Sequence, residues 1–383
     1  MEKNRNKRVF YVCFYSEREF ADQIVTYPSV WSKIEYIIDV LKRSEYDVTV
    51  VSAGMSCNGH FAGKKIYVDD REVHKYFSST KWKNSLLQKC AIAIQWGKIL
   101  TYLLLHRKKD EKVIVYHSLF HRMWLPLYQK VFGKSVVLEV EDVFSELDAL
   151  AERYKEKEWK MIRSADGCLF VNDIIREKVD VPSVISYGRY ATSDYSTRNK
   201  IETIRLVYAG VIEQNRNAAF LAVKAMRFLA DHHELHVLGF GDTKDIEALQ
   251  EEIQNVNRLF RSPKVFFHGR MDGDEYSAFL QSCDVGLSTH MYDETSFSSA
   301  DHTFPSKTLV YMANGLRVVA QRLLCLEKSA LRDMIVFYDE PTPQSVANAI
   351  MRIDHNQRYD SCERIKQLDE KFVKEISELL DTV

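Results

Sequence analysis

The stretch that decides the fold is Phe304–Gln321, FPSKTLVYMANGLRVVAQ. Its apolar residues first recur at helical spacing and then run together, which predicts a short amphipathic helix followed by a buried strand. Ser306 is expected to cap the helix by accepting a hydrogen bond from the first turn. Gly315 fits the left-handed residue that commonly ends a helix. The predicted core residues of this helix are Leu309, Met312 and Ala313.

The first turn of this predicted helix gathers positive charge. Its backbone N–H groups have no partner within the helix, and the helix dipole adds a partial positive charge. Lys307 contributes an ammonium group. Such a turn is suited to holding a phosphate or a diphosphate. The alternative is an ordinary helix–strand unit in which Lys307 is solvated.

Four further motifs precede this stretch, each at the end of a predicted strand. The second contains two glycines, which would let the backbone approach a ligand closely or would form a plain turn. It lacks the third glycine of a dinucleotide-binding fingerprint, so a dinucleotide is disfavoured. In order, the motifs are Tyr208-Ala209-Gly210, Val237-Leu238-Gly239-Phe240-Gly241-Asp242, Phe266-Phe267-His268-Gly269-Arg270 and Ser282-Cys283-Asp284-Val285-Gly286-Leu287.

The order and spacing of these motifs resemble the C-terminal half of GT-B glycosyltransferases, in particular family 4. The resemblance covers residues 204–340 well and the first half only loosely. It implies an α/β fold with two Rossmann-like, doubly wound parallel-sheet domains that face each other across a cleft. Apolar runs alternate with helical patterns in both halves, which independently favours parallel strands covered on both faces.

The expected domain organisation has four parts. Residues 1–188 would form an acceptor-side domain, and the polar, aperiodic segment 189–203 would be a linker. Residues 204–353 would form the domain that binds a nucleotide sugar. The charged tail 354–383 has apolar residues at helical steps, and the resemblance implies a last helix that packs back on the first domain.

The resemblance implies a glycosyltransferase that moves a sugar from a UDP or GDP donor to a glycan or a lipid-linked acceptor. Retention of the anomeric configuration and bacterial surface polysaccharide synthesis follow from it as expectations. We expect no metal ion and no cofactor, because the cations of the helix start would stabilise the diphosphate leaving group. Two alternatives are a non-catalytic GT-B partner subunit and a nucleotide-sugar epimerase of similar fold.

The resemblance also places the donor. It puts the base against the backbone of Gly269 and Arg270, and the loop His290–Thr303 would hold the sugar hydroxyls. Lys307 and Arg216 are the expected cations for the diphosphate, although a surface arginine is an equal alternative for Arg216. The predicted donor-binding residues are Gly210, Gly239, Gly241, Gly269, Arg270, Asp301, His302, Pro305, Ser306, Thr308 and Tyr311.

The chain departs from the family pattern at three positions. The family often carries two glutamates on the phosphate helix, and their positions fall here at His302 and Val310. Ribose recognition would then fall to Ser306 or Tyr311. Val211 stands where the family commonly has an arginine, which supports the alternative of a non-catalytic partner.

In the first half, Glu139, Glu141 and Asp142 close a predicted strand. Glu139 and Glu141 share one face of that strand, and Asp142 points to the other. Buried carboxylates are costly unless paired, so at least one is expected to face the cleft and to bind an acceptor or remove its proton. The competing use of Asp142 is to cap a helix that starts near Ser145.

Two other patterns suggest metal ligands. His117 ends a strand and His121 follows four residues later, which suits zinc on a helix, but no third ligand is evident. His117 is a candidate catalytic residue, with a buried structural histidine as the favoured alternative. Asp272-Gly273-Asp274 superficially resembles a metal-binding Asp-x-Asp, yet it lies where a helix needs a cap.

Composition limits the partners. The formal net charge is −1, so no global field recruits nucleic acid, and the seven cysteines form no CxxC cluster. Reduced thiols and the early first strand lead us to expect a cytoplasmic protein. The segment Leu86–Leu105 is long and apolar but is interrupted by Lys89 and Lys98. We expect a half-buried helix, with a peripheral contact at the inner face of the plasma membrane as the alternative.

Overall fold

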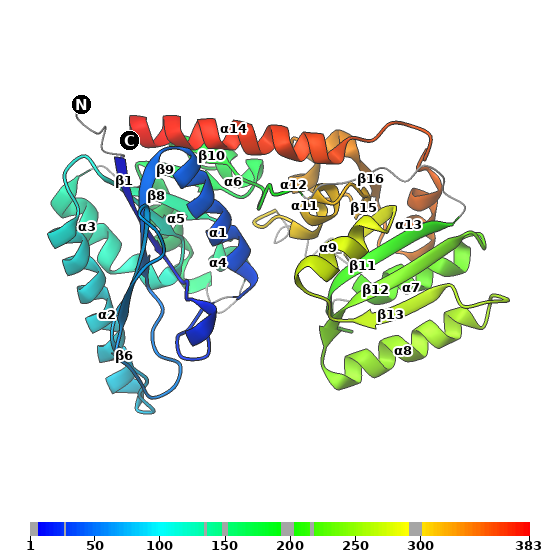
Figure 1. The fold of residues 1–383 in the computed structure, drawn as a ribbon, viewed down its shortest axis with the longest axis horizontal. Coiled ribbons are helices and arrows are strands. Elements are labelled where there is room, and N and C mark those ends of the chain that lie inside the picture. Colours follow the sequence, from blue (N-terminus) through cyan, green and yellow to red (C-terminus); the bar gives the residue numbers. More distant parts are fainter. Residues whose placement is uncertain are drawn as a thin grey trace. The chain divides into compact units, whose positions relative to one another are not determined.

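The computed structural model describes residues 7–26, 28–133, 136–147, 152–192, 203–214, 218–290 and 301–383. The chain divides into two compact units. Unit 1 comprises Met1–Arg189 together with Glu370–Val383, and unit 2 comprises Tyr190–Asp369. Each unit contains a sheet covered by helices on both faces, as Figure 1 shows.

Unit 1 is built on an eight-stranded sheet with the order β10-β9-β8-β7-β1-β2-β5-β4. Its pairs are parallel except for the edge pair β4–β5, and a small antiparallel sheet joins β3 to β6. The strands are β1 (Lys7–Cys13), β2 (Tyr46–Ser52), β3 (His60–Phe61), β4 (Lys64–Tyr67), β5 (Glu72–Tyr76), β6 (Ser79–Thr80), β7 (Lys112–Tyr116), β8 (Val136–Val140), β9 (Gly167–Phe170) and β10 (Ser183–Ile185).

Helices cover this sheet on both sides, so its central strands read as continuous apolar runs. In Figure 1, α2 and α3 lie on one side and α1 lies on the other. Asn84 starts α2 by accepting hydrogen bonds from the N–H groups of Leu86 and Leu87, at 2.9 and 3.2 Å. The helices are α1 (Pro28–Arg43), α2 (Ser85–His106), α3 (Trp124–Phe132), α4 (Phe144–Leu147), α5 (Lys155–Arg163) and α6 (Asp173–Glu177).

The edge of this sheet differs from the expected all-parallel arrangement. Residues 65–70, KIYVDD, are compatible in sequence with a further parallel strand. The structure places the first part of this segment in β4, which runs antiparallel to β5. β5 itself was not predicted, because its sequence EVHKY has no apolar run. Its buried His74 is held by carboxylates of Glu17 and Glu72 at 2.7 and 2.9 Å.

Unit 2 is built on a six-stranded, fully parallel sheet with the order β13-β12-β11-β14-β15-β16. A core of buried residues joins its strands to α7, α8 and α13. The strands are β11 (Ile204–Ile212), β12 (His233–Gly241), β13 (Val265–Gly269), β14 (Val285–Ser288), β15 (Arg317–Gln321) and β16 (Ile335–Tyr338). The helices are α7 (Ala218–Ala225), α8 (Thr243–Asn257), α9 (Gly273–Gln281), α11 (Ser306–Ala313), α12 (Leu324–Glu327) and α13 (Pro343–Met351).

The helix and strand predicted for Phe304–Gln321 are confirmed as α11 and β15. All three predicted core residues of α11 are buried, and Gly315 has a φ of 81°. Tyr311 packs directly on Gly286 of β14, where an added Cβ would lie 2.2 Å from the tyrosine ring.

The last helix, α14 (Ser361–Thr382), belongs to unit 2 up to Asp369 and to unit 1 from Glu370 onward. Within unit 1, Phe372 stacks on Tyr36 with ring centroids 6.0 Å apart. Ser44 donates a hydrogen bond to the Val373 carbonyl at 3.1 Å. Among the described helices, none has the length and apolar character that crossing a membrane requires.

The packing of Tyr311 on Gly286 yields a prediction about stability. Gly286→Ala is expected to lower the free energy of unfolding by about 1–3 kcal/mol, because the methyl group overpacks the contact. The matched control is Gly97→Ala on α2, where an added Cβ would meet no described atom within 4 Å. This control is expected to stabilise by about 0.5–1 kcal/mol. Urea unfolding followed by circular dichroism measures both, and equal effects would contradict the packing argument.

Candidate functional site

The strongest site candidate lies where β11 ends beside the start of α11. The Lys307 ammonium donates a hydrogen bond to the Tyr208 hydroxyl at 3.1 Å and lies 4.4 Å from the centre of its ring. An added Cβ at Gly210 would lie 2.4 and 2.5 Å from the Lys307 Cε and Nζ atoms. Glycine at position 210 therefore leaves the space in which the Lys307 ammonium lies over the strand end.

Gly239 and Gly241 serve strand packing. Both lie within β12, where they pair with Gly210 and Ile212 of β11. An added Cβ would lie 1.9 Å from the Gly210 carbonyl oxygen at position 239, and 2.2 Å from that of Ile212 at position 241. These two glycines therefore allow β11 and β12 to approach each other closely. The sequence had suggested either a ligand-binding loop or a plain turn at this position, and neither interpretation included strand packing.

The start of α11 differs from the sequence prediction. The N-cap is Pro305, and Ser306 is the first helical residue with an exposed side chain, so the predicted serine cap is wrong. The Thr308 N–H donates to the Pro305 carbonyl at 3.0 Å, so this N–H is already engaged. The Thr308 hydroxyl is buried and has no hydrogen-bond partner among the described residues.

Tyr311 is fully buried, so its hydroxyl is not accessible to a ribose in this structure. Its hydroxyl accepts a hydrogen bond from the Ala209 N–H at 2.9 Å and lies 3.5 Å from the Leu287 carbonyl oxygen. Burial raises the pKa of Tyr311 well above its ordinary value. Tyr311 therefore ties α11 to β11 and β14. Val310, at the position of the missing glutamate, is 36% exposed.

A second group of side chains gathers at the ends of β12 and β13. The Arg270 guanidinium lies 5.3 Å from the centre of the Phe240 ring and forms an ion pair with Asp272 at 2.8 Å. Phe240 is 51% exposed. Gly269 has a φ of 73°, and an added Cβ there would meet no described atom within 4 Å. Gly269 thus leaves open space beside an exposed aromatic ring and a guanidinium group.

The rest of the predicted donor site is only partly described. Arg216 and residues 291–300 of the polar loop lie outside the described residues. At the loop's two ends, the His290 N–H donates to the Tyr338 hydroxyl at 2.9 Å, His302 is buried, and Asp301 is half-buried.

In unit 1, the predicted carboxylates are paired. Glu139 is buried and accepts a hydrogen bond from the Tyr11 hydroxyl. Glu141 is half-buried, with an oxygen 3.3 Å from the Lys33 ammonium, which also donates to the Ser186 carbonyl at 3.0 Å. Burial, and then repulsion from Glu141, raise the pKa of Glu139, against the opposing effects of Lys33 and Tyr11.

His117 is buried in unit 1, with both ring nitrogens close to acceptor oxygens. It is 1% exposed, and its Nδ1 atom lies 3.1 Å from the Asp142 carbonyl oxygen. Its Nε2 atom lies 3.4 Å from a Glu158 oxygen, and burial lowers the pKa of the ring. Glu158 accepts hydrogen bonds from the N–H groups of Phe144 and Ser145, at 3.0 and 2.7 Å. Glu158 thus accepts the hydrogen bonds at the start of α4, a role for which the sequence offered Asp142 as an alternative.

The pair His117 and His121 and the Asp272-Gly273-Asp274 pattern are not part of a metal site in the described part of the chain. There, no three His, Cys, Asp or Glu side chains lie close enough together to hold a metal ion. The His121 Nδ1 atom accepts a hydrogen bond from the Trp124 indole at 2.9 Å. Asp272 is the N-cap residue of α9, as expected from its position.

Three residues of these sites were not predicted from the sequence, namely Lys33, Tyr11 and Phe240. Lys33 and Tyr11 contact Glu141 and Glu139 from more than a hundred residues away, so no local pattern could reveal them. Phe240 lies between Gly239 and Gly241, and an aromatic side chain between two glycines at a strand end is a signal by which the sequence could indicate it.

Comparisons with known proteins bear on the family and the fold. Residues 203–356 match the family described as glycosyl transferases group 1. None of the curated protein sequences matches the chain. Among solved structures, it is similar to an α,α-trehalose-phosphate synthase (UDP-forming) from Burkholderia vietnamiensis. The TM-score is 0.64 at 11% identity, over 98% of this chain and 99% of that one.

A second solved structure is equally similar. For the sucrose-phosphate synthase from Thermosynechococcus elongatus, the TM-score is 0.67 at 12% identity, over 98% of each chain. Identities this low show a shared fold and carry no statement about substrates.

The buried Glu139 gives a pH-dependent prediction. Its folded-state pKa lies above the ordinary value of 4.5, so its contribution to stability is present at low pH and is lost as the pH rises. Glu139→Gln keeps an oxygen for Tyr11 but cannot ionise. As the pH rises from 5 through the raised pKa, the free energy of unfolding of the variant is therefore expected to increase by about 1–3 kcal/mol relative to that of the parent protein.

Urea unfolding at a series of pH values measures this difference. Glu156→Gln, at an exposed position of the same unit, is the matched control and should follow the parent protein at every pH. If the stability of Glu139→Gln relative to the parent protein stayed constant or fell with rising pH, the raised pKa of Glu139 would be contradicted.

Proposed function

We propose a donor, a phosphate site and an acceptor class for this chain, which is a glycosyltransferase of the GT-B type. The donor is a nucleoside-diphosphate sugar bound at the strand ends of unit 2. The sugar passes to a glycan or a lipid-linked acceptor with retention of anomeric configuration, as in family 4. UDP is the first nucleotide to consider, because the similar trehalose-phosphate synthase is described as UDP-forming.

The diphosphate would bind above Gly210, next to Lys307. The observation that carries this placement is the space left by Gly210, which the Lys307 ammonium reaches over the Tyr208 ring. Negative charge develops on the diphosphate as the glycosidic bond breaks, and a prearranged cation stabilises it most at that moment. Lys307 and the N–H groups of Ser306 and Lys307 would supply this stabilisation without a metal ion.

The base would lie at the ends of β12 and β13. Gly269 offers backbone without a side chain, and Phe240 and Arg270 offer flat surfaces on which a base can stack. Asp301 and His302 border the loop that would hold the sugar. Ribose recognition would fall to Ser306, since Tyr311 is buried.

Unit 1 would supply the acceptor side. Glu141 and Asp142 are half-buried beyond the end of β8, so their carboxylates are the ones able to orient an acceptor hydroxyl. Surface polysaccharide synthesis in the cytoplasm, with a peripheral contact at the inner face of the plasma membrane, fits a lipid-linked acceptor.

Substitution of Lys307 tests the phosphate site. Lys307→Ala is expected to lower turnover with the cognate sugar nucleotide by about 10²–10³, as the removal of one such stabilising donor does elsewhere. Gly210→Ala keeps the cation but displaces its end, and is expected to cost up to about 10². Lys374→Ala, at a solvent-exposed lysine of α14, is the matched control and should leave turnover unchanged.

Calorimetric titration with UDP and GDP, followed by transfer assays with a panel of sugar nucleotides, provides the measurements. Unchanged turnover and donor affinity in Lys307→Ala would overturn the placement of the diphosphate. Failure to bind either nucleotide would favour the non-catalytic partner indicated by Val211 and Val310. Release of an altered sugar nucleotide without acceptor would favour an epimerase.

A further inference from the structure

The solvent-facing side of α2 is apolar along its whole length. Leu86, Ile94 and Leu105 are 67%, 58% and 75% exposed, while the opposite side buries Ile99 and Leu103 in unit 1. At 1.5 Å per residue, this apolar side extends over about 30 Å. Its other members are Leu87, Cys90, Ala93, Gly97, Thr101 and Leu104.

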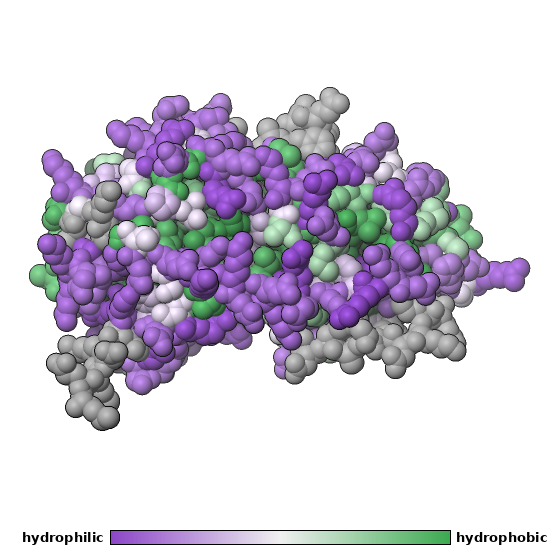
Figure 2. All heavy atoms as spheres, turned by 90° about the horizontal axis from the view of Figure 1, so that it is seen from above, coloured by the Kyte–Doolittle hydropathy of each residue, from purple (hydrophilic) through white to green (hydrophobic). Residues whose placement is uncertain are grey.

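Helix α3 extends the same surface. It packs beside α2 on the same side of the sheet, so the exposed sides of both helices point away from the sheet together. Met123, Leu127 and Val131 recur every four residues and are 59%, 50% and 58% exposed. Figure 2 shows apolar side chains at the surface at the end of unit 1 where α3 lies. We call the exposed sides of α2 and α3 the α2–α3 face.

Positive charge surrounds this face. Residues 73–109 contain eight Lys or Arg and no Asp or Glu, in a chain whose net charge is −1. Lys81, Lys83 and Lys89 are exposed around the first turns of α2, and Lys108 and Lys109 follow its end. Trp82 precedes α2 and is 44% exposed. Aromatic side chains of this kind favour the boundary between water and lipid.

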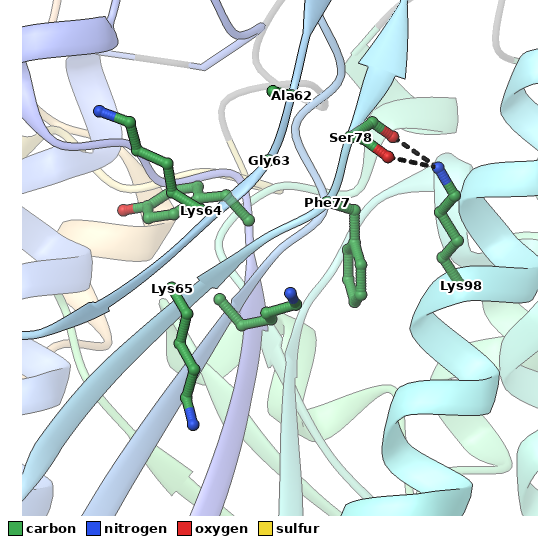
Figure 3. Close-up of a pocket in the computed structure, with 9 residues that line it drawn as sticks. Ala62, Gly63, Lys64, Lys65, Phe77, Ser78 and Lys98 are labelled. Carbon is green, nitrogen blue, oxygen red and sulfur yellow. Dashed lines mark hydrogen bonds between the residues drawn. The ribbon is translucent and has the colours of Figure 1, made fainter.

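Hollows lined by lysines lie between α2 and strand β5. One of about 470 Å³ has Phe77, Ile94 and Leu105 on its walls beside Lys75 and Lys98. A neighbouring one of about 450 Å³ adds Lys65. In Figure 3, Phe77 lies between the strand and α2, and Lys98 reaches across to the Ser78 carbonyl and hydroxyl, at 2.6 and 3.1 Å.

We propose that the α2–α3 face docks on the surface of an anionic lipid bilayer. Its apolar side chains enter the boundary between head groups and acyl chains, and the surrounding lysines attract the anionic head groups. The hollows beside Lys75 and Lys98 accept head-group phosphates. The helix lies in the plane of the membrane, because Lys89 and Lys98 interrupt its apolar residues.

A second copy of the chain is a poorer occupant. A two-fold symmetric contact would place the α2–α3 face against itself and so bring the exposed lysines of two copies together, among them Lys81, Lys83 and Lys89. An anionic bilayer complements both the charge and the apolar surface. This inference rests on the peripheral membrane contact of the proposed function and names the surface that makes it. Docking needs no sugar nucleotide, so a failure of docking and a failure of the proposed donor site are distinguished by different measurements.

Sedimentation of the full chain with vesicles tests the proposal. Binding is expected to vesicles of phosphatidylcholine with phosphatidylglycerol, and to weaken strongly with phosphatidylcholine alone or with added salt. The double variant Ile94→Glu, Leu105→Glu is expected to lose at least tenfold in partitioning. Leu259→Glu, at a 63% exposed leucine of unit 2, adds one such charge elsewhere and should bind like the parent protein.

The lysines provide a graded test. Alanine at Lys81, Lys83 and Lys89 is expected to weaken binding about fivefold for each lysine, the gain that one cation obtains near an anionic membrane. Quenching of tryptophan fluorescence by brominated phosphatidylglycerol gives an independent measure of membrane contact in the parent protein. Trp82 emission should be quenched, and Trp82→Phe should lose most of the quenching.

Three outcomes would overturn the proposal. The first is absence of binding to the anionic vesicles, and the second is equal binding by the double variant and the Leu259→Glu control. The third is a dimer of the parent protein in sedimentation equilibrium that the double variant abolishes, since the face would then be an interface between copies.

Discussion

The close contact of α11 with the ends of β11 and β14 sets the chemistry available to unit 2. Two side chains one helical turn apart, Lys307 and Tyr311, fasten the helix to consecutive residues of β11, namely Tyr208 and Ala209. Both contacts need glycine on the facing strands. The cation is thus held by a buried phenol beneath it, and the rigidity of the site comes from the core instead of from a surface loop.

Much of unit 2 could be predicted because most of its strands read as buried apolar runs, and because glycines stand at or near the ends of β11, β12 and β13. The N-cap of α11 was missed, because a serine after proline reads as a cap whether or not the helix has already started. Tyr311 was offered for the ribose because the two glutamates of the family pattern are missing. Its actual partner, the Ala209 N–H, could not be found from the sequence, since helical spacing identifies a buried face but not the partner of a hydroxyl group. β5 was missed because its polar residues are paired within unit 1, which no local pattern reveals.

The polar interior of unit 1 illustrates the same limit in energetic terms. A buried carboxylate is costly alone, so the sequence Glu139–Glu141 implies partners without naming them. Lys33 and Tyr11 come from α1 and β1, and the fold brings them to the end of β8. The two carboxylates differ in exposure. Glu141 is half-buried and so is partly accessible from solvent, whereas Glu139 is fully buried.

The division of α14 has a consequence for biosynthesis. Phe372 and Ile376 are almost fully buried within unit 1, although they are translated after all of unit 2. At about 5–20 residues per second, the ribosome needs on the order of ten to forty seconds between Arg189 and Glu370. Throughout this interval the nascent first unit lacks the part of α14 that later packs on it, so the surface under Phe372 and Ile376 stays uncovered until that helix is synthesised.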